Sequence, residues 1–205
     1  MEFIQGVSLQ QRVEEEGMLR PGRAIRIMIQ VCEALEEAHG KGVLHRDIKP
    51  GNLLMEDNLD RVRIADFGIA QELRPGTSAI VSTDATAAGT RPFMSSEQEQ
   101  SRELDGRTDI FSLGMTSYFM LTGRLAANAR SSLGPPFLFK EQEFVPPSRF
   151  NRQVSPALDR VVLKTIATER KHRYPSCGAV LDDLRPLGEA RATRRQGLGI
   201  LGWNY

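Results

Sequence analysis

The sequence predicts a mainly α-helical domain with small β elements. Between residues 21 and 40, apolar side chains recur every three or four positions, which is the pattern of a helix that buries one face. Residues 108–121 are apolar on all sides, as expected of a helix inside a core. Between residues 43 and 69, short apolar pieces alternate with polar turns, and this pattern indicates small strands and loops.

Local signals mark where the helices begin and end. Ser8 can cap the first helix, and Pro21 and Pro156 suit the first turn of two later ones, since proline lacks an N–H that this position leaves unused. The helices predicted in this way cover residues 9–17, 21–40, 108–121, 156–167 and 176–184. Residues 71–89 are small and polar and predict a mobile loop, and residues 128–147 are irregular and rich in proline.

Composition excludes several classes of protein. The 205 residues are 40% hydrophobic and 26% charged, which is the balance of a folded domain and not of a disordered tail, a collagen or a disulfide scaffold. The length suits one ordinary domain or one lobe of a larger unit. A formal net charge of +1 provides no overall field for polyanions, so we expect no nucleic-acid partner.

The two cysteines, Cys32 and Cys177, belong to no C-x-x-C or Cys/His cluster, so neither zinc nor a redox disulfide is predicted. A reducing, cytoplasmic location is the expectation that follows. The longest uncharged apolar stretch, residues 110–121, is shorter than the roughly 20 residues that span a bilayer. We therefore expect no membrane segment and no secretory leader in these residues.

The most informative motif is HRDIKPGN at residues 45–52, followed nineteen positions after Asp47 by DFG at residues 66–68. Taken alone, Asp47 or Asp66 would be assigned to a turn or a helix cap, but the joint spacing favours function. The sequence here resembles the protein kinase family, and the resemblance extends over nearly the whole chain. It is similar to the C-terminal lobe of a bacterial-type (Hanks-type) serine/threonine protein kinase.

The resemblance implies roles for four residues in phosphoryl transfer from ATP. Asp47 would orient the substrate hydroxyl and accept its proton, and Lys49 would place a positive charge near the transferred phosphate. Asn52 and Asp66 would supply the oxygen ligands of Mg²⁺ on the ATP phosphates. By the same resemblance, Lys49, Asn52 and Asp66 contact the nucleotide, whereas His45 supports the catalytic loop.

The first residues resemble the hinge between the two lobes of a kinase. Met1 takes the gatekeeper place, and the backbone of Glu2 and Ile4 would bond the adenine edge. Leu54 would form the apolar floor beneath the adenine. The alternative is that residues 1–6 are a frayed end without such a role.

Residues 66–97 resemble the activation segment. Arg46 directly precedes Asp47, and in the family this arrangement goes with control by phosphorylation, because an arginine fork pairs well with phosphate. Thr90 would bridge Asp47 and Lys49. The candidate phosphate acceptors are Thr77, Ser78, Ser82, Thr83 and Thr86, of which the last three are favoured.

Three charged residues are predicted to be structural. Glu97 would pair with Arg173, and Asp109 resembles the buried aspartate that hydrogen-bonds the backbone of the catalytic loop. A buried carboxylate persists only when its hydrogen bonds are satisfied, so we expect each of them to be fully partnered.

The domain organisation follows from these matches: residues 1–6 as hinge remnant, residues 7–186 as the kinase C-lobe, and residues 187–205 as a basic, loosely ordered tail. No glycine-rich loop and no strand lysine precede the catalytic loop, so the expectation is a kinase fold without its N-terminal lobe. Two interpretations stay open: a kinase region with weak or no activity by itself, and a non-catalytic kinase-like binding module. The partners implied are proteins with Ser or Thr acceptors and a second kinase copy.

Overall fold

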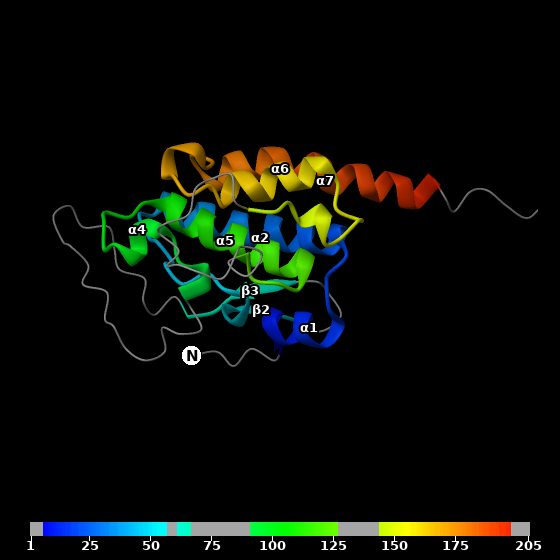
Figure 1. The fold of residues 1–205 in the computed structure, drawn as a ribbon, viewed down its shortest axis with the longest axis horizontal. Helices are drawn as coiled ribbons and strands as arrows, with labels where there is room; N and C mark the ends of the chain where they lie inside the picture. Colours follow the sequence, from blue (N-terminus) through cyan, green and yellow to red (C-terminus); the bar gives the residue numbers. More distant parts are fainter. Residues whose placement is uncertain (1–5, 57–60, 67–90, 127–143, 198–205) are drawn as a thin grey trace, which may run out of the picture.

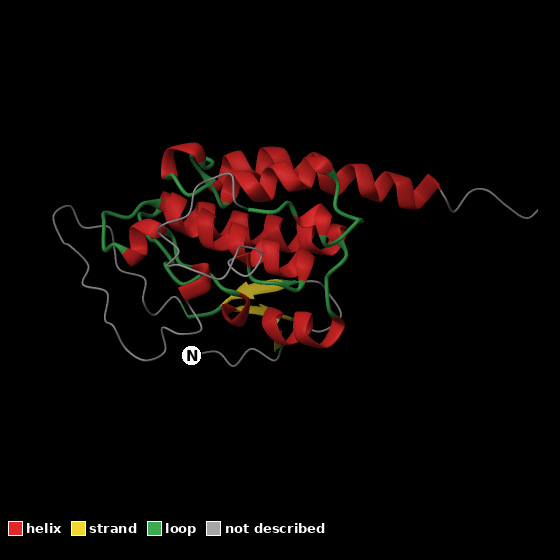
Figure 2. Cartoon of the chain, viewed as in Figure 1, coloured by secondary structure: helices red, strands yellow, loops and turns green. Residues whose placement is uncertain are grey.

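The computed structural model describes residues 6–56, 61–66, 91–126 and 144–197. Helices form the upper layers of the molecule and a small sheet lies beneath them (Figures 1 and 2). Helices α2 (Pro21–Gly40) and α5 (Gly106–Thr122) form the central layer. Helices α6 (Pro156–Thr165) and α7 (Cys177–Gly197) cover one side of it, and α1 (Leu9–Glu16) lies with the sheet on the other. The predicted mainly helical class with small β elements is confirmed.

The first two helices begin where the sequence predicts. The Ser8 hydroxyl accepts from the Gln11 N–H, and the Gln11 side chain returns to the Ser8 backbone, so the pair forms a capping box. Gly17 ends α1 with a φ of +77°, a region that favours glycine. Pro21 starts α2, whose apolar face is fully inside the core: Ala24, Ile25, Ile27, Met28, Val31, Cys32 and Leu35.

The sheet has the order β1-β2-β3, with both pairs antiparallel. Its strands are β1 (Val7–Ser8), β2 (Leu53–Met55) and β3 (Val62–Ile64). The sequence did not predict β1, because two residues are too few to show an alternating pattern. The sheet is fixed to α2 by the Val62 N–H, which donates to the Gln30 side chain at 3.0 Å.

Helix α5 runs through the middle of the core, and almost all its side chains are buried. Asp105 caps its start, and Gly123 ends it in the left-handed region with a φ of +64°. Its buried hydroxyls at Ser117 and Thr122 donate to carbonyls one turn earlier, which satisfies them without an external partner. Gly114 allows close approach of α6, since a Cβ there would lie 2.3 Å from Thr165 Oγ1.

Helix α7 is longer than predicted. The sequence places a helix end at residue 184 and a loose tail from residue 187, but the backbone stays helical through Pro186 as far as Gly197. Proline costs one helical hydrogen bond, and the helix nevertheless continues past it. Leu187 packs on the core, and a Cβ added at Gly188 would lie 3.6 Å from Ile25 and 3.8 Å from Ile29, so this part of α7 runs close to α2.

The remaining described elements are short and connect the helices. They are η1 (Pro50–Asn52), η3 (Arg91–Phe93), α4 (Ser96–Glu99), η7 (Pro147–Arg149) and η8 (Arg170–His172). The predicted hinge up to residue 5, the predicted loop at 71–89 and most of the irregular stretch at 128–147 lie outside the described residues. Within the part of the chain that the structure describes, no helix combines the length and apolarity needed to cross a bilayer.

Candidate active site

The backbone of the catalytic-loop motif is held by one carboxylate from α5. The amide N–H groups of His45 and Arg46 donate to the two oxygens of Asp109, at 2.9 Å and 2.7 Å. The Gln98 side chain of α4 donates to the Arg46 carbonyl at 2.7 Å. These bonds hold Arg46 at a φ of +67°, a strained value for a residue with a Cβ. The predicted role of Asp109 is confirmed.

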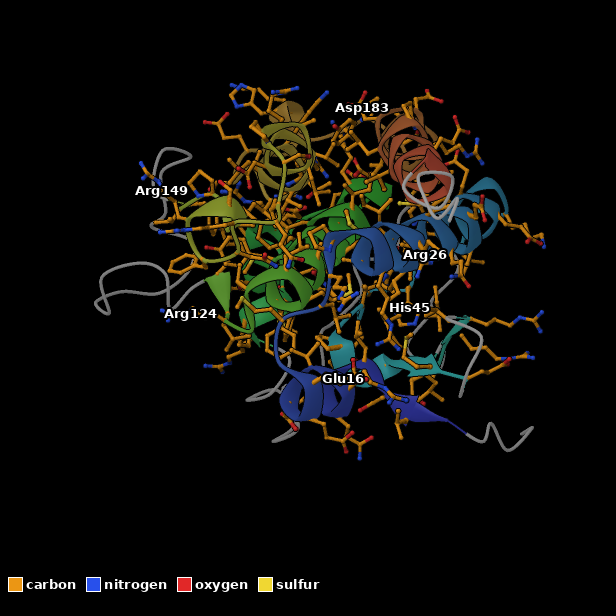
Figure 3. All side chains as sticks on the ribbon, turned by 90° about the vertical axis from the view of Figure 1, so that its right-hand side faces the viewer. Glu16, Arg26, His45, Arg124, Arg149 and Asp183 are labelled. Carbon is orange, nitrogen blue, oxygen red and sulfur yellow. The ribbon has the colours of Figure 1, made fainter. Side chains whose placement is uncertain are left out.

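The ring of His45 joins this loop to the segment that carries Asp66. His45 is fully buried and lies between α2 and the strands (Figure 3). Its Nδ1 accepts from the Asp47 N–H at 3.2 Å, so Nε2 carries the hydrogen and donates to the Ala65 carbonyl at 3.1 Å. These bonds tie the backbone of Asp47 to that of Ala65 through the ring, which agrees with the predicted supporting role of His45.

The two carboxylate oxygens of Asp47 differ in their hydrogen-bond partners. Lys49 Nζ donates to Oδ2 at 2.8 Å, and the Asn52 amide donates to the same oxygen at 2.9 Å and to the Asp47 carbonyl at 2.8 Å. Oδ1 is buried and has no hydrogen-bond partner among the described residues. A buried acceptor without a partner is uncommon and marks a place where another group can bind.

Asn52 and Asp66 are brought together by the backbone. The Ala65 N–H donates to the Asn52 carbonyl at 2.8 Å, which places the residue before Asp66 directly beside Asn52. The Asn52 amide nitrogen is engaged by Asp47, so the orientation of its oxygen is set. Asp66 is exposed, with a φ of +60°. Asn52 contacts the Asp47 carboxylate, and Asp66 follows a residue bonded to the Asn52 backbone, so the two segments carry hard oxygen donors of the kind suited to Mg²⁺.

A second buried carboxylate fixes the element that contacts the loop. Glu97 of α4 receives both terminal nitrogens of Arg173, at 2.6 Å and 3.1 Å, and the Thr108 hydroxyl at 3.1 Å. Burial alone would raise the pKa of Glu97, but the bonds from Arg173 outweigh it and lower that pKa. The predicted pair is confirmed, and it keeps Gln98 in place on the Arg46 carbonyl.

Comparison with protein families shows which family this chain belongs to. The model described as "Protein kinase domain" matches residues 1–182. The chain belongs to the protein kinase family. Its relatives include the serine/threonine-protein kinase PknB of Mycolicibacterium smegmatis, 36% identical over 192 residues, which are 94% of this chain and 30% of the relative. PknB of Mycobacterium tuberculosis is 34% identical over 184 residues, with 90% and 29% covered.

The solved structures agree on the fold of this kinase chain. A crystal structure of the Mycobacterium tuberculosis PknI kinase domain superposes with a TM-score of 0.66 at 24% identity, covering 91% of this chain and 63% of that one. The chain spans only about 30% of the length of the curated relatives that it matches. The kinase-like fold is therefore shown, and the activity, substrates and partners of the whole protein are matters for proposal.

The kinase structure also contains a site residue that the sequence analysis missed. His39, near the end of α2, places its Nε2 2.8 Å from Asp109 Oδ2. Burial would lower the pKa of His39, but the neighbouring Asp109 carboxylate outweighs burial and raises it to about 10. A single histidine on a helix gives no local signal, because its partner lies 70 positions away.

Several predicted kinase site residues cannot be compared with the geometry. Leu54 lies half-buried in β2 between Ser8 and Arg63 on the neighbouring strands, and its adenine-floor role stays a prediction. The predicted residues that lie outside the described ranges are Met1, Glu2, Ile4, Phe67, Gly68, Thr77, Ser78, Ser82, Thr83, Thr86 and Thr90.

Proposed function

We propose that these residues catalyse transfer of the γ-phosphoryl group of ATP to serine or threonine hydroxyls of proteins. The observation that carries the proposal is that the two oxygens of the Asp47 carboxylate differ in their hydrogen bonding. Oδ2 is held by Lys49 and Asn52, whereas buried Oδ1 has no partner among the described residues. A carboxylate that is oriented through one oxygen can accept a substrate hydroxyl with the other.

The roles of the two nearest charges follow from this geometry. Oδ1 of Asp47 orients the hydroxyl and accepts its proton as the hydroxyl oxygen attacks the γ-phosphorus, while the bond from that phosphorus to the bridging oxygen of the β-phosphate breaks and ADP leaves. General-base assistance of this kind contributes roughly 10²–10⁴-fold to a rate. Lys49, 2.8 Å from Oδ2, keeps the carboxylate in place and adds positive charge where the phosphoryl group passes.

Asn52 and Asp66 fit the family's typical use of ATP with Mg²⁺. The described residues contain no group of three or more His, Cys, Asp or Glu side chains that could enclose a metal ion. A cation at this site would therefore depend on Asn52, Asp66 and oxygens of the nucleotide, as is usual for Mg²⁺. When bound, Mg²⁺ neutralises charge on the phosphates. Leu54, Glu2 and Ile4 are the proposed adenine contacts.

Control by phosphorylation is the proposed role of Arg46. Its backbone is fixed at both ends, by Asp109 and Gln98, so its side chain starts from a defined position. Phosphate on Ser82, Thr83 or Thr86 would be an anionic ligand for that guanidinium and would tie the activation segment to the catalytic loop. A contact of Thr90 with Asp47 and Lys49, a second kinase copy as partner and a cytoplasmic location are further parts of the proposal.

We further propose that the 205-residue polypeptide by itself transfers phosphate weakly or not at all. No glycine-rich loop and no strand lysine precede its catalytic loop, and these groups normally clamp the ATP phosphates. Gly197, Gly199 and Gly202 have G-x-G-x-x-G spacing, but they follow the kinase match, which ends at residue 182. The same observation favours the alternative function, a kinase-like binding module that does not phosphorylate its partner.

The test compares two purified polypeptides: the 205 residues, and the whole gene product that contains them. Binding of Mg²⁺-ATP and phosphate incorporation would be measured for each, with Asp66→Ala as the control. We expect phosphate on Ser or Thr in the whole product, little in the 205-residue polypeptide, and none in either control.

Each other outcome has a definite meaning. Phosphate on the 205-residue polypeptide that vanishes in Asp66→Ala would overturn the proposed weakness. Folded samples of both polypeptides that neither bind the nucleotide nor incorporate phosphate would overturn the kinase proposal and favour the binding module.

A further inference from the structure

Met18 is an exposed apolar side chain on a fixed backbone. It is 48% exposed, and no other large apolar side chain among the described residues is exposed. The Leu19 N–H donates to the Met120 carbonyl at 2.8 Å, and a Cβ added at Gly123 would lie 3.8 Å from Met18 Cγ. These contacts place Met18 beside the end of α5. A single exposed apolar residue needs no explanation by itself, so its surroundings decide what it can do.

Positive charge gathers around the same end of α5. The Asn151 side chain donates to the Leu121 carbonyl at 3.0 Å, and the Arg124 guanidinium lies 4.8 Å from the centroid of the Phe150 ring. These contacts bring residues 149–152 to the end of the helix, and Figure 3 shows Arg124 and Arg149 on the same side of the molecule. The exposed arginines here, none of which forms an ion pair with a described residue, are Arg20, Arg124, Arg149 and Arg152. The partial negative charge of a helix C-terminus favours a nearby cation, but it does not account for four.

Negative charge lies on the other side of Met18, at the end of α1. Residues 14–16 are three exposed glutamates. Glu16 is neutralised by Arg12 and Arg23, whose guanidinium groups lie 3.2 Å and 2.7 Å from its two oxygens. The other two glutamates form no ion pair with a described residue. The Met18 face, which we define as Glu14, Glu15, Met18 and the four arginines, therefore carries opposite charges on the two sides of an apolar side chain.

A second copy of the chain is the partner that suits the Met18 face. A purely acidic partner would be repelled by Glu14 and Glu15, and a purely basic one would be repelled by the arginines. In a two-fold contact both copies use the same face, and a residue near the axis meets itself. The acidic side of each copy then faces the basic side of the other. The net charge of +1 adds little repulsion between the two copies.

We propose that two copies of the chain associate through the Met18 face around a two-fold axis, with Met18 packed against Met18 of the partner subunit. Glu14 and Glu15 face the arginines across the interface. The face lies at the opposite end of α5 from Asp109, since Asp109 and Met120 are about 16 Å apart along the helix axis. The contact therefore uses none of the residues assigned to catalysis. It gives a location to the second copy named in the proposed function, but it does not depend on phosphate transfer, so the two proposals can fail separately.

Sedimentation equilibrium of the purified 205-residue chain, at concentrations up to about 100 µM, tests the association. In about 50 mM salt we expect the mean mass to rise from 22.9 kDa toward twice that value, and to fall again in about 500 mM salt, which screens the charges. Met18→Ser should weaken the association about tenfold or more, because it removes the apolar centre of the interface. A chain that stays monomeric in low salt, or that assembles beyond twice the monomer mass, would overturn the two-fold contact.

Two charge reversals test which surfaces meet. Glu15→Arg and Arg124→Glu each place like charges opposite one another, so each variant alone should associate about tenfold or more weakly than wild type. An equimolar mixture of the two should regain the wild-type dimer, because the changed acidic side of one copy then faces the changed basic side of the other. Arg102→Glu makes the same charge change near the start of α5 and should associate as wild type does. Circular dichroism checks that each variant is folded.

Two outcomes of this exchange would overturn the proposal. If Arg102→Glu weakened the association as much as Arg124→Glu, overall charge and not the Met18 face would control it. If the mixture stayed monomeric while each variant was folded, the two sides would not face each other. Neither measurement involves ATP, so both remain decisive if the chain transfers no phosphate.

Discussion

Two carboxylate–cation pairs in this molecule are linked to the catalytic loop but are built differently: Asp47–Lys49 lies within the loop, and Glu97–Arg173 holds the helix α4 that contacts it. In the Glu97–Arg173 pair the side chains are 6% and 0% exposed, and Arg173 also donates to the carbonyls of Ala167, Arg107 and Thr168. In the Asp47–Lys49 pair the side chains are 11% and 24% exposed, and one carboxylate oxygen has no partner among the described residues.

The difference separates a structural pair from a functional one. In the first pair, hydrogen bonds compensate the buried charges, so the pair fixes α4 and leaves no capacity for a ligand. In the second, Lys49 and Asn52 orient the carboxylate, but buried Oδ1 has no hydrogen-bond partner among the described residues. Each pair joins one carboxylate to one cation, and the two pairs differ in exposure and in the number of satisfied atoms.

Breaking the structural pair should have the largest effect. Arg173→Met leaves the Glu97 charge buried without its cation, which typically costs about 3–5 kcal/mol of unfolding free energy. Urea unfolding followed by circular dichroism would measure it. The double variant Glu97→Gln, Arg173→Met should recover part of the loss, since no charge is then left unpaired. A single variant as stable as wild type would show that the pair contributes nothing.

Breaking the functional pair should lower the rate of phosphate transfer but leave the free energy of unfolding nearly unchanged. In the whole gene product, Asp47→Asn should lower phosphate transfer by roughly 10²–10⁴-fold, because the base is lost while the shape is kept. The unfolding free energy should stay within about 0.5 kcal/mol of wild type, as for a partly exposed position. A large loss of stability in this variant would place Asp47 with the structural residues instead.

Removing one neutral hydrogen-bond donor to Glu97 measures how much a single satisfied atom contributes to the stability of the structural pair. Thr108→Val keeps the shape of the side chain but removes the hydroxyl that donates to Glu97 at 3.1 Å. A hydrogen bond to a charged group contributes about 1.5–3 kcal/mol, so we expect a loss in that range by urea unfolding. The same variant made together with Glu97→Gln should show a smaller loss, and equal losses would refute the contact.

Acid should weaken the structural pair. The pKa of Glu97 is lowered below its ordinary value of 4.5, because the bonds from Arg173 outweigh burial. A lowered carboxyl pKa gives stability that is fully present above pH 4.5 and is lost as the pH falls through the folded-state value. The stability difference between wild type and Glu97→Gln should therefore shrink between about pH 7 and about pH 3. A constant difference across this range would contradict the lowered pKa.

Local sequence signals accounted for most of the described helices. The Ser8 cap, the first-turn prolines Pro21 and Pro156, and the apolar period of residues 21–40 act within a few residues, so they can be recognised without a distant partner. The predictions failed where the deciding contact was distant. Helix α7 continues past Pro186, where Leu187 packs on the distant core, and the strand β1 exists because β2 pairs with it.

The sequence alone determined the helical class and the motif that resembles a kinase catalytic loop, because residue type and spacing are sufficient for both. It did not determine which polar groups are satisfied. His39 meets Asp109 across 70 positions, and Gly178 meets Glu36 across 142. Such contacts depend on how helices pack, and packing is a property of the assembled core. The tertiary structure therefore decided which carboxylate oxygens have hydrogen-bond partners and which do not, and the proposed chemistry depends on that difference.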